Sequence, residues 1–151
     1  MRTLDTDTYM SVLKELVEEG REVSLLISGS SMEPLLRDQR DSICFKSPDR
    51  ELAKGDMVFY QRTNGQYIMH RIYRVGPEGY YLVGDHQVVI EGPLKREQIF
   101  GLVTKVQRNG RWIGPESLTW KFFVHVWPRT IPMRAAFGRV KRKLRRVHEE
   151  V

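Results

Sequence analysis

Short apolar segments alternate with turn sequences from Val23 to about Val106, and this pattern constrains the fold more than any other feature of the chain. Thr63-Asn64-Gly65 lies between two such segments and is typical of a β-hairpin turn. Regularly spaced short strands predict a small, coiled β-domain of the sandwich or barrel type. The strands are expected at residues 23–27, 42–45, 57–61, 67–75, 80–83 and 100–107.

A helix is expected on the N-terminal side of these strands, within residues 1–20. Asp5 or Thr6 can cap it, and Gly20 is a plausible end. Apolar residues recur there at intervals of three and four, which predicts one buried face. The residues of this face are Tyr9, Val12, Leu13, Leu16 and Val17.

The chain becomes helical again after the β-domain, which we assign to residues 21–114. Residues 115–151 form a C-terminal extension in which a Trp-rich helix at 116–127 precedes Pro128 and Pro132. A second helical stripe follows among many Arg and Lys residues, and most of the net charge of +6 lies there. The apolar residues of this stripe are Met133, Ala136, Phe137, Val140, Leu144 and Val147.

Composition narrows the class of protein. A chain of 151 residues with 40% hydrophobic residues suits one globular domain. Cys44 is the only cysteine, so an intrachain disulfide scaffold is excluded. No pair of Cys or His residues has metal-ligand spacing, and no cofactor or metal is expected.

Ser31 is the main candidate for a nucleophile. It lies directly after the first expected strand, between Gly29 and Pro34. A serine hydroxyl becomes nucleophilic when a base takes its proton and donors stabilise the oxyanion. His70 is the candidate base, and Asp85 or Glu91 could orient it. The same composition is also common in ordinary turns.

Several segments resemble, in order, the motifs of signal peptidases. Residues 29–34 (GSSMEP) are similar to the serine box, and residues 54–60 (KGDMVFY) resemble the strand that follows it. Residues 67–72 (YIMHRI) resemble the segment that carries the base, with the histidine of the endoplasmic-reticulum and archaeal type in place of the bacterial lysine. Residues 83–87 (VGDHQ) resemble a glycine–aspartate box, and residues 99–103 (IFGLV) a strand shared with LexA-type autoproteases.

This resemblance implies a serine endopeptidase on a signal peptidase/LexA-like fold. Ser31 would be the nucleophile, His70 the general base and Asp85 the orienting acid, with Glu91 as the alternative acid. Gly29 stands where several family members have a serine that helps to bind the oxyanion, so a second donor has to come from the main chain or from Ser30. The implied substrate is a leader or precursor peptide.

The family normally has a transmembrane anchor, and none is expected in this sequence, nor is a signal peptide. The protein is therefore expected in the cytoplasm or at the inner face of a membrane. Residues 120–147 could contact anionic lipid, with Trp120, Phe123 and Trp127 at the headgroup boundary. The alternative is that the Trp-rich helix packs on the β-domain. No nucleic-acid partner is expected, because no recognised nucleic-acid-binding module precedes the basic segment.

Two other functions remain open at this point. The chain could be a peptide- or membrane-binding module that keeps the fold without catalysis. It could also be a self-cleaving regulator of the LexA type, although the short N-terminal segment leaves little room for a DNA-binding domain.

Overall fold

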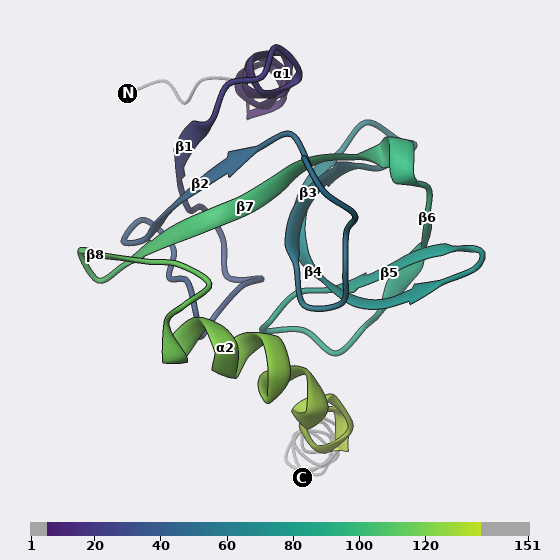
Figure 1. The fold of residues 1–151 in the computed structure, drawn as a ribbon. Coiled ribbons are helices and arrows are strands. Elements are labelled where there is room, and N and C mark those ends of the chain that lie inside the picture. Colours follow the sequence, from purple (N-terminus) through teal and green to yellow (C-terminus); the bar gives the residue numbers. More distant parts are fainter. Residues whose placement is uncertain (1–5, 137–151) are drawn as a thin grey trace, which may run out of the picture.

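The protein is mainly β, with an antiparallel sheet and an N-terminal helix (Figure 1). The structure is a computed structural model and describes residues 6–136. Its helices and strands are α1 (Thr6–Glu18), β1 (Val23–Leu26), β2 (Ser42–Lys46), β3 (Met57–Gln61), β4 (Tyr67–Gly76), β5 (Gly79–Val83), β6 (Glu91–Leu94), the 3-10 helix η1 (Arg96–Gln98), β7 (Ile99–Arg108), β8 (Arg111–Ile113), α2 (Leu118–His125) and the 3-10 helix η2 (Trp127–Thr130).

All strands belong to one sheet, in the order β1-β2-β7-β3-β4-β5-β6, with β8 also paired to β7. In Figure 1, β3 to β6 curve around one end of the molecule, while β1 and β2 lie at the other. Every pairing is antiparallel, and β-bulges shift the register in several of them, for example between Cys44 and Phe45. Bulges increase local twist, which fits the strong coiling of this sheet.

Strand β3 is buried on both faces. Met57 and Phe59 point into a core cluster with α1 and α2, whereas Val58 and Tyr60 point into a second cluster between β3, β5 and β7. Successive side chains of a strand point to opposite faces, so a strand between two cores has no polar side. This explains why residues 57–60 are apolar or aromatic without interruption.

Helix α1 ends where the sequence predicts, but its buried face is rotated; Asp5, one of the two expected caps, lies outside the described residues. Leu13 and Val17 are buried as expected, together with Met10. Tyr9 and Val12, by contrast, are exposed. Gly20 has φ +93° and its N–H donates to Val17, which gives the helix its C-terminal cap.

The described part of the C-terminal extension packs on the sheet. Ser117 caps α2, and Phe123 is buried in the same cluster as α1, with Trp120 and Trp127 packed against it. For these three aromatic residues, the structure shows packing on the β-domain, which is the alternative to a place at a lipid headgroup boundary. Their burial follows from the i, i+3 spacing, which places Trp120 and Phe123 on one face.

Two of the strands, β6 and β8, are not predicted from the sequence. Strand β6 contains Gly92 and Pro93 and lies at the sheet edge, where proline is tolerated. Strand β8 has three residues and follows a turn in which Asn109 and Gly110 both have positive φ.

The helical stripe predicted at the C-terminus is described only as far as residue 136. Residues 131–136 are helical, whereas Phe137, Val140, Leu144 and Val147 lie outside the described residues. Between residues 6 and 136, no helix is both long and apolar enough to cross a membrane.

Candidate active site

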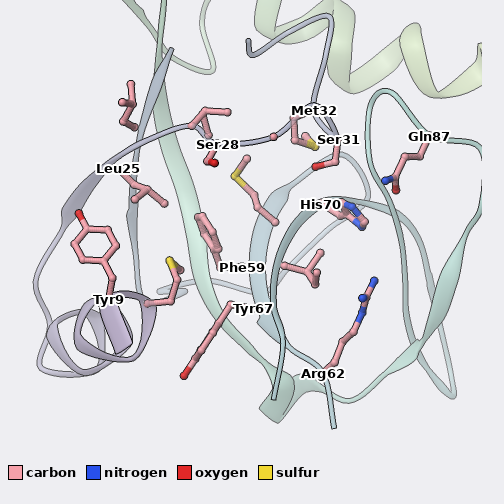
Figure 2. Close-up of a pocket in the computed structure, with 16 residues that line it drawn as sticks. Tyr9, Leu25, Ser28, Ser31, Met32, Phe59, Arg62, Tyr67, His70 and Gln87 are labelled. Atoms are coloured by element: carbon pink, nitrogen blue, oxygen red, sulfur yellow. The ribbon is translucent and has the colours of Figure 1, made fainter. Parts of the chain in front are cut away.

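Ser31 and His70 line the same pocket. This pocket has a volume of about 600 Å³ and lies between residues 25–32 on one side and residues 67–70 on the other. Figure 2 shows Ser31 and His70 at the same end of it, beside Gln87. The structure thus brings together the nucleophile and the base that the sequence predicts, from segments far apart in the chain.

Most of the pocket wall is apolar, and several of its residues were not anticipated from the sequence. Helix α1 closes one end with Tyr9 and Met10, and Arg62 lies at another point of the wall. No local motif marks these residues, because only the packing of α1 against the sheet places them there. The other apolar residues that line the pocket are Leu25, Leu26, Ile27, Met32, Phe59, Tyr67, Ile68 and Met69.

Two backbone edges flank the pocket. Strand β1 pairs with β2 alone, and β4 pairs with β3 alone as far as His70, because β5 joins β4 only at Arg71. The backbone groups on the open side of an edge strand are available to an added strand. The pocket is therefore a slot that an extended chain can enter between β1 and the first half of β4.

The turn that carries Ser31 is anchored in the core. Met32, Leu35 and Leu36 are buried directly after Ser31, which is itself half-buried. The N–H of Gly29, a residue with φ +92°, donates to the carboxylate of Asp38 at 2.8 Å. That bond supports the turn and removes the Gly29 N–H as a donor to an oxyanion.

A buried carboxylate, Asp41, fixes the loop between β1 and β2. It accepts the backbone N–H groups of Arg37 and Asn109, and its own carbonyl accepts the N–H of Ile27. Burial opposes its ionisation, but hydrogen bonds from Arg40 and from these N–H groups outweigh burial and lower the pKa of Asp41 to about 2. The loop that presents Ser31 is therefore held by a permanent charge.

His70 is buried, with 5% of its surface exposed. Its Nδ1 lies 3.2 Å from the hydroxyl of Tyr60, which donates to Glu91 Oε1 at 2.7 Å. Its Nε2 lies on the side of Gly84, next to the backbone of Ser31. A side chain at Gly84 would begin 3.1 Å from Nε2 and 2.5 Å from the carbonyl oxygen of Ser31, so only glycine fits between them.

The pKa of His70 is lowered to about 4. Desolvation by burial is the largest cause, the negative charge of Glu91 opposes it, and the positive charge of Arg62 adds to it. His70 is therefore neutral at pH 7 and able to accept a proton. In the described chain, Ser31 Oγ makes no hydrogen bond to His70. In catalytic sites without substrate, the hydrogen bonds between catalytic groups are often long or poorly aligned.

Asp85 does not contact His70, which corrects its predicted role. Both of its carboxylate oxygens accept from Arg71, with Nε and Nη2 each 2.8 Å away. Arg71 and Asp85 are 1% and 2% exposed, so they form a buried bidentate ion pair. The adjacent position of His70 and Arg71 explains the outcome: neighbouring residues of a strand point to opposite faces, and Asp85 lies on the Arg71 side.

Glu91, the alternative acid, approaches His70 only through the hydroxyl of Tyr60. Arg62 donates to both of its carboxylate oxygens, at 2.9 and 2.7 Å. The hydrogen bond from Arg62 is the largest cause of a lowered pKa at Glu91, which is therefore ionised at pH 7. The sequence does not reveal Tyr60 in this position, since an aromatic residue in a buried strand is usually part of the core.

The loop at residues 84–87 connects Ser31 to the C-terminal extension. The N–H of His86 donates to the Ser31 carbonyl at 2.9 Å. On its other side, Trp127 Nε1 and Arg134 both donate to the carbonyl of Asp85, at 2.7 and 2.8 Å. The extension therefore helps to position the loop that borders the candidate nucleophile.

Ser30, the other expected supporting residue, is exposed, and its carbonyl accepts the N–H of Glu33. The backbone N–H of Ser31 has no acceptor in the described chain and remains a possible oxyanion donor. No group of His, Cys, Asp and Glu side chains among residues 6–136 is arranged to hold a metal ion. No protein-family model matches the chain, and no curated protein matches it significantly.

The buried pair yields a stability prediction. Asp85→Asn leaves the Arg71 guanidinium buried without a counter-charge, and such losses destabilise proteins by about 3–5 kcal/mol. Chemical denaturation should show this decrease in the free energy of unfolding. Asp49→Asn breaks an exposed pair with Lys46 and is the matched control, with an expected change below about 1 kcal/mol. An Asp85→Asn protein as stable as the control would contradict the structural role.

Proposed function

We propose that the protein is a serine endopeptidase of the signal peptidase type, with a signal peptidase/LexA-like fold. The observation that carries the proposal is the meeting of Ser31 and His70 at one end of an apolar slot between two backbone edges. A serine in a well-anchored turn and a buried neutral histidine are the groups that acyl transfer requires. The ordered sequence motifs support the same conclusion.

In the proposed reaction, Ser31 Oγ attacks the carbonyl carbon of a peptide bond while His70 Nε2 takes its proton. The tetrahedral oxyanion accepts a hydrogen bond from the Ser31 N–H. The C–N bond then breaks, and the imidazolium returns the proton to the leaving amine. Water then attacks the carbonyl carbon of the acyl-enzyme while His70 takes its proton. The bond from this carbon to Ser31 Oγ breaks, and His70 returns the proton to Oγ.

The low pKa of His70 fits this sequence of charges. In the free protein, burial keeps water away from His70, so the charged imidazolium is disfavoured and the neutral form is favoured. When the oxyanion forms beside it, opposite charges arise together in a buried site, and the imidazolium gains a partner. The base is therefore strengthened at the moment when it must hold the proton.

The substrate is an extended segment of a leader or precursor peptide. Such a segment can pair with β1 on one side and with residues 67–70 on the other, in the manner of an added β-strand. Its apolar side chains would contact the lining of the slot. A non-catalytic peptide-binding module is the alternative, because the same slot could hold a peptide without cleaving it.

Acylation of Ser31 tests the chemistry without a known substrate. A serine-acylating reagent should modify the folded protein once, at Ser31, as measured by intact mass and peptide mapping. Ser31→Ala and His70→Ala should each abolish this modification while circular dichroism stays unchanged. Ser47→Ala is the control, because Ser47 lies outside the slot and should leave labelling intact. Binding of extended peptides without any acylation would favour the binding module.

The pH dependence of the acylation rate provides a second test. A general base works when it is neutral, and the lowered pKa keeps His70 neutral down to about pH 4. The rate should therefore remain high from pH 7 to pH 5 and fall only as the pH passes about 4, with circular dichroism recorded at each pH. A decline centred near pH 6.5, the ordinary pKa of histidine, would refute the buried-base assignment.

We further propose that the C-terminal extension contacts an anionic membrane, at the inner face in the cell. With Trp120 and Phe123 packed inward, α2 exposes another row of apolar side chains. Leu118, Phe122 and Val126 are exposed by 84%, 42% and 48%, at intervals of four residues. Residues 118–136 contain Lys and Arg but no Asp or Glu, and further basic residues follow. Apolar side chains among cations are suited to an interface of anionic lipid.

Flotation with lipid vesicles tests this contact. The protein should float with vesicles that contain phosphatidylglycerol and remain behind with phosphatidylcholine alone, and high salt should weaken the binding. The double variant Leu118→Asp and Val126→Asp should lose flotation. Val75→Asp, at a similarly exposed position of β4, is the control. Equal flotation of both variants would reject this surface.

A further inference from the structure

A chain of hydrogen bonds lies behind His70, on the side away from Ser31. It runs from His70 Nδ1 to the Tyr60 hydroxyl at 3.2 Å, from this hydroxyl to Glu91 Oε1 at 2.7 Å, and from Glu91 to the guanidinium of Arg62. Tyr60 is fully buried, and its ring meets the His70 ring edge-on. The members come from β3, β4, β6 and the turn after β3, so the folded sheet alone brings them together.

The direction of each hydrogen bond follows from the charges. Glu91 is ionised, because Arg62 binds both of its oxygens, and an ionised carboxylate only accepts. The single proton of the Tyr60 hydroxyl must therefore point to Glu91. Burial and Glu91 raise the pKa of Tyr60, so the hydroxyl keeps this proton.

The hydroxyl oxygen of Tyr60 then faces His70 as an acceptor. Nδ1 must be the protonated ring nitrogen, because two lone pairs cannot share a hydrogen bond. A neutral imidazole carries one proton, so Nε2 is left with its lone pair. Nε2 is the nitrogen on the side of Gly84 and Ser31.

We propose that Tyr60 is a positioning residue that holds His70 in the Nδ1–H tautomer, with Glu91 and Arg62 as its support. This role rests on the proposed function, since the tautomer matters only if His70 takes the proton of Ser31. In catalytic triads, a carboxylate performs the task directly. Here the Tyr60 hydroxyl connects His70 to the carboxylate of Glu91, while Asp85 is paired with Arg71.

The relay also acts on the imidazolium that forms during the reaction. The second proton goes to Nε2, and the hydrogen bond from Nδ1–H to Tyr60 becomes charge-assisted and stronger. Among residues 6–136, Glu91 is the group whose charge raises the pKa of His70. The described titratable or charged groups that face His70 are Tyr60 from β3, Glu91 from β6 and Arg62, and the carboxylate of Asp85 in the loop after β5 is paired with Arg71.

NMR of the histidine ring nitrogens tests the tautomer directly. Long-range ¹H–¹⁵N spectra of the labelled full-length chain at pH 7, with His70 assigned through His70→Gln, should show the proton on Nδ1. In Tyr60→Phe the acceptor is gone, and the Nε2–H form should become populated. Tyr80→Phe, a partly buried tyrosine of β5, is the control and should leave the His70 signals unchanged.

Kinetics of Ser31 acylation give the functional consequence. Tyr60→Phe should lower the maximal acylation rate on the order of 10²-fold, with little change in the reagent's apparent binding constant, because the base holds its proton on the wrong nitrogen. Glu91→Gln keeps an acceptor for Tyr60, so it should retain the Nδ1–H form. It removes the charge that raises the pKa of His70, and an NMR titration should show a lower value than in the wild type.

The two proposals fail in different ways. A proton on Nε2 in the wild type, or an Nδ1–H form that persists in Tyr60→Phe, overturns the role of Tyr60 whatever the activity. Absence of Ser31 acylation in a wild type with the expected tautomer overturns the peptidase instead. If Tyr60→Phe does not fold, the pKa shift in Glu91→Gln decides, and an unchanged His70 pKa counts against the relay.

Discussion

The buried ion pair between Arg71 and Asp85 holds the candidate site together. It joins β4, immediately after His70, to the loop that borders Ser31. Arg71 also donates to the carbonyl of Gly55 at 2.8 Å, so the segment before β3 is tied to the same point. Both charges are out of water, and their bidentate geometry compensates for the lost hydration. The loop at residues 84–87 can therefore hold a fixed position next to Ser31 without a large apolar core of its own.

In the proposed mechanism, this arrangement separates two tasks that one carboxylate performs in many serine hydrolases. Asp85 has a structural task and never reaches His70. Glu91 provides the negative charge for the base, but at a distance, through Tyr60. A more remote charge raises the pKa of the base less than a direct contact does, which agrees with a His70 pKa dominated by desolvation. His70 is therefore neutral over a wide pH range, and in the proposed mechanism the developing oxyanion strengthens it as a base.

The sequence is most informative where periodicity or turn chemistry dominates. The six expected strands, the hairpin turn at 63–65 and the end of α1 at Gly20 all appear in the structure. Long-range relations are different. Strand alternation cannot tell that Asp85 faces Arg71, because this depends on how β5 and its following loop meet β4. Which face of α1 is buried, and the contact of Tyr60 with His70, likewise depend on the packing of distant segments, which local patterns do not encode.

The bonds from Trp127 and Arg134 to the loop at 84–87 have a consequence for biosynthesis. A chain growing on the ribosome has Ser31, His70 and Asp85 long before it has these two donors. The loop beside Ser31 lacks its outer support until residues 127–134 have emerged. Residues that follow the β-domain thus complete the support of the candidate site, so its loop at 84–87 is fully positioned only after they have been synthesised.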